Sequence, residues 1–177
     1  EDLKNDFELK TRDQSKLFEY FCNYCVFSKS YLGRFNPIEV TTLEDDASID
    51  GIAVVIDGEL ITTEDDAIQI FDTHKKNIPV EIIFTQVKSG ERFKKDEISN
   101  FALGLSDFLT LEPELPNGKY NQEVIKIIAA DINKVFFITI YLTLNCFICF
   151  ISYLLASKIH FLPVLDIKFP CVTLYIF

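Results

Sequence analysis

The chain has 177 residues, of which 49% are hydrophobic and 25% charged, as expected for one globular domain with a sizeable core. Its formal net charge of −10 counts against non-specific nucleic-acid binding, because such binding depends on lysine and arginine neutralising phosphates. Five cysteines, an odd number at ordinary density, fit a reducing cytoplasm better than a disulfide framework. The chain starts at Glu1, contains no methionine and opens without an apolar signal sequence, so we expect a cytoplasmic fragment.

The first predicted elements are a helix and a hairpin. Ser15 can cap a helix through residues 16–32, with apolar residues in helical spacing, and Gly33 and Pro37 end it. After an acidic loop at 43–48, two apolar runs flank Asp57-Gly58, which predicts a β-hairpin because this dipeptide tolerates positive φ. The apolar helical positions are Leu17, Phe18, Phe21, Cys22 and Cys25.

The middle of the chain alternates helix and strand. Residues 63–77 begin with acids and end with lysines, which favours a short helix, and residues 80–88 predict a buried strand. An amphipathic helix is predicted from Asp96, and another over 121–132. This order predicts an α/β fold with a small mixed sheet flanked by helices. The expected buried stripe of the amphipathic helix is Ile98, Phe101, Ala102, Leu105, Phe108 and Leu109.

The sequence changes character after Lys134, so we divide the chain into a domain at 1–130 and a hydrophobic tail at 131–177. Val135–Ala156 carries no charge and is long enough to cross a bilayer. The flanking charges show no orientation bias, however, and the apolar texture continues to the last residue. We favour a tail from a shifted or truncated reading frame, with a membrane helix and a buried core element as alternatives.

Polar residues stand at the ends of two predicted strands. Asp50 opens the hairpin, while Gln86 and Lys88 end the next strand and lie two residues apart, hence on one face. If the strands are neighbours, these groups meet at one edge of the sheet. The Asp50 carboxylate, the Gln86 amide oxygen and the Val87 carbonyl are the hard ligands that Mg²⁺ prefers. Lys88 can then orient or deprotonate a water, or stabilise charge on a phosphate.

Four stretches, LFEYFCNYCVFSKSYLGRFNP, SIDGIAVVIDGELIT, VEIIFTQVKSGERF and EISNFALGLSDFL, together resemble the N-terminal domain of the abortive-infection phage-resistance family. That domain belongs to the restriction-endonuclease-like PD-(D/E)xK superfamily, in a variant with Gln in the second motif. The resemblance covers about residues 15–130. The family's glycine pair before IDG is Ala47-Ser48 here, and nothing after about residue 130 resembles the family's C-terminal region.

The resemblance implies a restriction-endonuclease-like fold and a nuclease of bacterial antiviral defence that uses Mg²⁺ or Mn²⁺. It assigns catalytic roles to Asp50, Gln86, Lys88 and Glu19, with Asp50, Gln86, Val87 and Glu19 around the metal. The expected partner is nucleic acid, DNA rather than RNA, with a missing C-terminal region or a second copy of the chain as further partners.

Other readings stay open. One alternative is a catalytically silent interaction module with the same fold, which the net negative charge and Ala47-Ser48 favour. The chain can be a small membrane protein anchored by Val135–Ala156. The CxxC pairs at 22–25 and 146–149 could suggest a zinc site, but both lie in apolar segments, where buried thiols are common.

Overall fold

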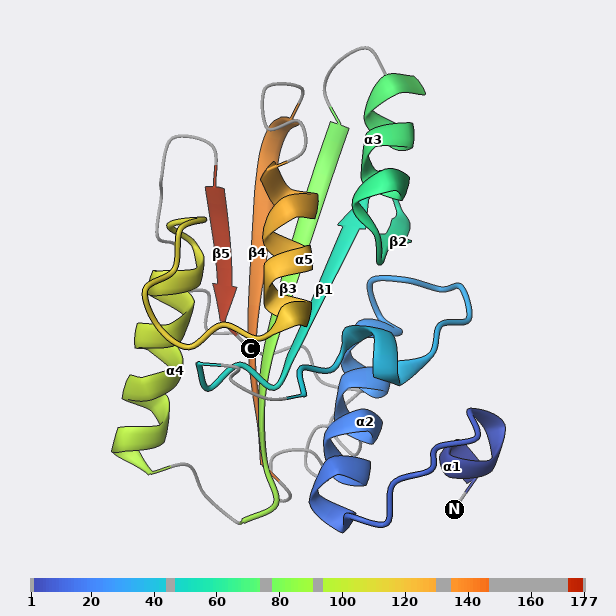
Figure 1. The fold of residues 1–177 in the computed structure, drawn as a ribbon, viewed down its shortest axis with the longest axis vertical. Helices are drawn as coiled ribbons and strands as arrows, with labels where there is room; N and C mark the ends of the chain where they lie inside the picture. The colour runs from blue at the N-terminus through green and yellow to red at the C-terminus, as the bar shows by residue number, and fades with distance from the viewer. Residues whose placement is uncertain are drawn as a thin grey trace, which may run out of the picture.

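The computed structural model describes residues 2–43, 47–73, 78–90, 94–129, 135–146 and 172–176, the last two ranges as backbone apart from the Ile140 side chain. The described residues form a mixed five-stranded sheet in the order β2-β1-β3-β4-β5, with helices packed on it (Figure 1). An α/β fold with a mixed sheet is therefore confirmed. The elements are α1 (Asp2–Asp6), α2 (Gln14–Phe27), the 3₁₀-helix η1 (Pro37–Val40), β1 (Gly51–Ile56), β2 (Glu59–Ile61), α3 (Glu64–Thr73), β3 (Ile78–Lys88), α4 (Lys95–Phe108), α5 (Lys119–Ala129), β4 (Val135–Cys146) and β5 (Val172–Ile176).

The predicted hairpin is present. β1 pairs antiparallel with β2, and the two turn residues Asp57 and Gly58 have φ of 52° and 84°. Two successive positive φ angles are what a two-residue turn between twisted strands requires. β1 also pairs antiparallel with β3, beginning at Gly51 opposite Thr85. The start of β1 therefore lies beside the end of β3, which brings the two groups of predicted site residues to one end of the sheet.

The sheet continues past residue 130, into the segment that we set apart as a tail. β4 pairs in parallel with β3 along its length, and β5 pairs in parallel with β4. Parallel neighbours need a crossover, which α4 and α5 provide between β3 and β4. Val135–Cys146 is a strand and no part of a membrane helix, while residues 147–156 lie outside the described residues. No described helix combines the length and apolarity that crossing a bilayer would require.

The two faces of the sheet carry different helices. One face packs against α3, α4 and α5, with Phe84 of β3 edge-on to Phe108 of α4 at 5.4 Å between ring centroids. The other face packs against α2 and η1, where Ala53 and Ile83 contact Phe27. β1 is buried along its whole length because it is covered on both faces.

The predictions for α2 need three corrections. Asp13, not Ser15, caps the helix, and its side chain accepts a hydrogen bond from the Ser15 N–H at 2.8 Å. The helix ends at Phe27, before Gly33, since the Ser28 N–H and hydroxyl both bond the Tyr24 carbonyl and close the last turn. The buried face is also rotated from the predicted one and includes a polar residue; its members are Tyr20, Cys22, Asn23 and Phe27, whereas Phe21 is 38% exposed.

The helix α4 lies where it was predicted, but its buried stripe is narrower. Phe101, Leu105 and Phe108 are buried, while Ile98, Ala102 and Leu109 are exposed. The reason is Gly104, where an added Cβ would lie 1.8 Å from the Ala47 carbonyl oxygen. This close approach sets the line along which the helix meets the rest of the molecule. The acidic start of α3 matches the prediction; the lysines at 75 and 76 and the acids at 44–46 lie outside the described residues.

Glu81 is a half-buried carboxyl in the middle of β3, paired with Val55. Burial raises its pKa, so the folded chain binds the proton more tightly than the unfolded chain, and stability falls as pH rises through the folded pKa. We expect Glu81→Gln to stabilise the protein at pH 8, with a smaller gain at pH 5. Urea denaturation at both pH values measures this.

Glu59→Gln, on the exposed part of edge strand β2, is the control for the chemical change itself. A gain for Glu81→Gln that is equal at both pH values would contradict the burial argument.

Candidate functional site at the end of β3

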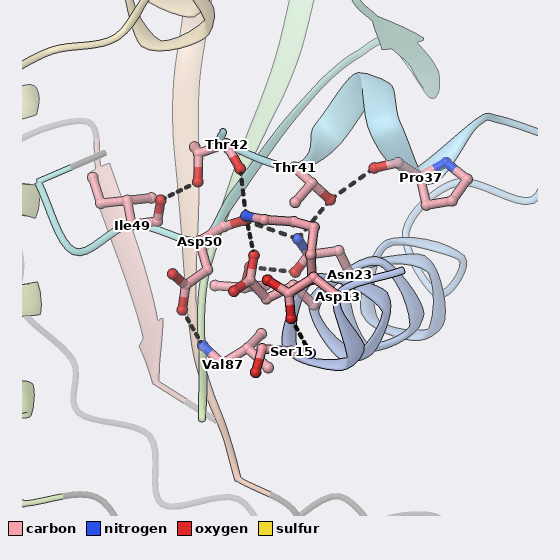
Figure 2. Close-up of polar contacts among 12 residues, drawn as sticks. Asp13, Ser15, Asn23, Pro37, Thr41, Thr42, Ile49, Asp50 and Val87 are labelled. Carbon is pink, nitrogen blue, oxygen red and sulfur yellow. Dashed lines mark hydrogen bonds and ion pairs between the residues drawn. The ribbon is translucent and has the colours of Figure 1, made fainter. Parts of the chain in front are cut away.

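Asp50 lies immediately before β1 and is 9% exposed. Its carboxylate Oδ2 accepts a hydrogen bond of 2.6 Å from the Val87 N–H, near the end of β3 (Figure 2). The backbone N–H of Asp50 donates to the Thr85 carbonyl at 2.9 Å. The structure thus places the acid from one strand against the residue that separates Gln86 from Lys88.

Gln86 is the least ordinary residue of this group. It is 2% exposed, and its side-chain oxygen Oε1 has no hydrogen-bond partner among the described residues. Buried amide oxygens are nearly always bonded, because an unmade bond costs about 1–3 kcal/mol. This oxygen, one residue from the Val87–Asp50 contact, is therefore available as a ligand for a metal cation.

Val87 and Lys88 complete the end of the strand. The Val87 side chain packs on Cys22 of α2, so Gln86 and Lys88, which alternate with it, point to the opposite face. The pairing of β1 with β3 begins at Thr85, so the ladder does not reach Val87. Its carbonyl lies on the same side as its N–H, toward Asp50, as in any strand. Lys88 is half-buried at the last position of β3.

Glu19 lies near this group but has its own partner. It forms an ion pair with Lys16, whose ammonium also donates to the Thr42 carbonyl at 3.2 Å. Burial, the largest factor, raises the pKa of the Cys22 thiol to about 12, and Cys25, followed by the carboxylates of Glu19 and Asp50, adds to the increase. Both acids therefore lie within electrostatic reach of one buried thiol, with a lysine already bound to Glu19.

The loop that delivers Asp50 is strained. Ala47 and Ser48 have φ of 50° and 66°, in the left-handed region that glycine adopts without penalty. These are the two positions at which the resembled family has glycine. The entry to β1 therefore has a glycine-like backbone at two residues that are not glycine, and Gly104 of α4 packs against it.

A buried polar network, which our sequence analysis missed, holds the backbone of Asp50 in place. The Asp50 carbonyl accepts hydrogen bonds from the Asn23 side-chain amide at 3.0 Å and from the Thr42 N–H at 3.2 Å (Figure 2). The Thr42 hydroxyl donates to the Ile49 carbonyl at 2.5 Å. The only signal in the sequence was an asparagine four residues after Glu19, on the same side of a largely apolar helix.

Two further observations bear on metal binding. Among the described residues, His, Cys, Asp and Glu side chains form no group of three or more that could hold a metal ion. The donors available here are one carboxylate, one side-chain amide oxygen and one backbone carbonyl, which suit Mg²⁺ because it keeps several waters. Cys22 and Cys25 are free thiols, and Cys149 lies outside the described residues.

Comparisons with known proteins leave the site to be judged on its geometry. No protein-family model, curated protein or solved structure matches this chain.

We expect Ala47→Gly to stabilise the protein by about 1 kcal/mol, because it relieves a left-handed conformation that costs alanine about 1–2 kcal/mol. For a chain of this size the melting temperature should rise by roughly 2–4 °C, measurable by circular dichroism.

The matched control is Ala102→Gly on the exposed face of α4. The same substitution there should destabilise by about 1 kcal/mol, because the helix backbone gains nothing from glycine. If both variants melt lower than the parent, the strain at Ala47 does not exist.

Proposed function

We propose that this chain is the restriction-endonuclease-like domain of an abortive-infection phage-defence protein, and that it hydrolyses phosphodiester bonds of nucleic acid, DNA rather than RNA. One observation carries the proposal: the buried Gln86 oxygen, which has no partner among the described residues, lies one residue from the point where the Asp50 carboxylate meets β3. A buried amide oxygen with no partner in the described part of the chain, and a carboxylate bonded to the N–H of the next residue, supply two ligands of the kind that a hard cation prefers. The resembled motifs place their second-motif and acidic residues at these two positions.

The proposed roles follow from the donors. Asp50, Gln86 and the Val87 carbonyl hold Mg²⁺ or Mn²⁺, which when bound polarises a phosphate oxygen and acidifies a water. Lys88 shares the face of Gln86 at the end of the strand, where its ammonium can orient that water or stabilise negative charge on the phosphate. The Glu19 carboxylate is paired with the Lys16 ammonium, so Glu19 can bind the metal only if this ion pair breaks.

The cations with which a polyanionic substrate would interact at this end of the molecule lie among acids. The N-terminal ends of α2 and α4 and the C-terminal end of β3 lie at the same end of the molecule (Figure 1). Cations at a surface can bind phosphates even where the total charge is negative. The cations on or beside these three ends are Lys10, Arg12, Lys16, Lys88, Lys94 and Lys95, and the acids at the same ends are Asp13, Glu19, Asp96 and Glu97.

A second candidate is a metal-free interaction module with the same fold. The observation in its favour is the Lys16–Glu19 ion pair, which supplies a cation where the family site would use a metal. The two candidates differ in whether Asp50 and Gln86 bind a divalent ion, so metal binding separates them.

We expect Gln86→Leu to weaken Mn²⁺ binding about tenfold or more, because it removes a ligand. The metal-free protein should lose no stability and can gain up to about 1 kcal/mol, since the variant no longer buries an unbonded amide oxygen. Isothermal calorimetry and urea denaturation of the full chain measure the two effects.

Gln69→Leu, on the exposed face of α3, is the matched control and should leave Mn²⁺ binding unchanged. A parent protein that binds no Mn²⁺ would favour the metal-free module. A large loss of stability in Gln86→Leu would mean that the amide has a structural role.

With Mg²⁺ and supercoiled plasmid, the full chain should nick or linearise the DNA, and EDTA should stop the reaction. We expect Lys88→Ala to lower the cutting rate about 100-fold, the usual contribution of a group that assists proton transfer or stabilises charge. Gel electrophoresis over time measures the rate, with Lys126→Ala on the exposed face of α5 as the control. Equal cutting by the parent and Lys88→Ala would remove Lys88 from the mechanism.

A further inference from the structure

The side chain of Asn23, on α2, is fully buried and joins three separate segments of the chain. Its amide nitrogen donates to the Asp50 carbonyl at 3.0 Å and to the Thr41 hydroxyl oxygen at 2.9 Å. Its amide oxygen accepts from the Thr85 hydroxyl at 2.6 Å. Both ends of the amide are therefore bonded inside the protein, between α2, the start of β1 and the end of β3 (Figure 2).

The partners determine which way the amide faces. A backbone carbonyl can only accept, so the nitrogen must be the atom that faces Asp50. The Thr41 hydroxyl donates its one hydrogen to the Pro37 carbonyl at 2.7 Å, which leaves its oxygen to accept from Asn23. The position requires a donor and an acceptor on one short side chain, a need that an aspartate or a leucine of similar size cannot meet.

Gly51 provides the space for this contact. A Cβ built on Gly51 would lie 2.4 Å from the Asn23 amide nitrogen and 2.6 Å from the Thr85 hydroxyl oxygen. Any larger residue would push the amide away from the strand. The glycine that follows Asp50 is thus required by the asparagine on the helix.

We propose that Asn23 is the positioning residue of the Asp50 carboxylate. With the Asp50 N–H bonded to the Thr85 carbonyl, and its carbonyl bonded to the Asn23 amide and, at a longer distance, to the Thr42 N–H, the backbone of this residue is held on both sides. The 2.6 Å bond from the Val87 N–H then directs its carboxylate toward β3. Asn23 lies one helical turn after Glu19, so α2 acts on the site through an amide bonded to the backbone of the acid.

This inference rests on the proposed function only for its effect on metal binding, because the positioning itself can be measured without a metal. The test compares Asn23→Asp, which places an oxygen against the Asp50 carbonyl, with Thr41→Val. The control removes the two bonds of the Thr41 hydroxyl, to the Asn23 amide and to the Pro37 carbonyl, and leaves the Asn23–Asp50 bond in place. Asn23→Asp loses both bonds of the amide nitrogen, so both variants should lose stability, Asn23→Asp more because it also buries a carboxyl group against a carbonyl.

The first readout is amide hydrogen exchange at Val87, followed by NMR on the metal-free full chain. We expect at least tenfold faster exchange at Val87 in Asn23→Asp, relative to neighbouring β3 amides, and no such selective change in Thr41→Val. Unchanged Val87 exchange in a folded Asn23→Asp variant overturns the proposal. If Asn23→Asp does not fold, Asn23→Ala, which removes the amide donor to the Asp50 carbonyl without burying a carboxyl group, takes its place with the same expected and contrary results.

The second readout is Mn²⁺ affinity by calorimetry, which we expect to fall about tenfold in Asn23→Asp and to stay at the parent value in Thr41→Val. Equal weakening in both variants would mean that the network acts only through general stability, and would overturn the specific role of Asn23. A parent chain that binds no Mn²⁺ defeats the proposed function alone, since the Val87 readout still decides the positioning.

Discussion

The arrangement of this molecule depends on the hydrogen bonds that tie Asp50 to the end of β3. One bond runs from the Asp50 N–H to the Thr85 carbonyl and another from the Val87 N–H to the Asp50 carboxylate. They join the start of one strand to the end of another across a part of the sheet where regular pairing is only beginning. A carboxylate there satisfies a backbone donor that the ladder does not reach. The same contact holds the acid beside Gln86 and Lys88.

Several features around this contact are unfavourable for stability and consistent with a binding site. The loop through Ala47 and Ser48 is left-handed without glycine, and the Gln86 amide oxygen is buried without a bond among the described residues. Strain and unsatisfied polar groups of this kind gather at functional sites, where the rest of the structure holds them in place. The Asn23 network has the opposite character. Both the nitrogen and the oxygen of the Asn23 amide are hydrogen-bonded, and these bonds fix the backbone next to the strained loop.

The elements that were predicted correctly depend on local rules. Asp57-Gly58 formed the expected hairpin because the turn conformation is decided within two residues. The predictions that were wrong depended on neighbours distant in sequence. Ile98 and Leu109 have the spacing of a buried stripe, yet the contact of Gly104 with Ala47 selects a different line along α4. Val135–Cys146 fitted a membrane helix as one alternative because the apolar run alone does not distinguish a bilayer helix from a strand that pairs with a neighbour on each side, as β4 does.

The sequence by itself determined the mixed α/β fold, the hairpin and the positions of Asp50, Gln86 and Lys88 at strand ends, because residue periodicity and turn chemistry are local properties. Only the tertiary structure decided that β1 and β3 are neighbours, in the register that brings Asp50 to Val87. It also decided that Lys16 forms an ion pair with Glu19 and that Asn23 bonds the backbone of Asp50. These are contacts between segments more than twenty residues apart, except for the ion pair, whose choice of partner depends on the Thr42 carbonyl that anchors Lys16. Strand register and buried hydrogen bonding arise from the packing of the whole chain, so no local pattern of residues can specify them.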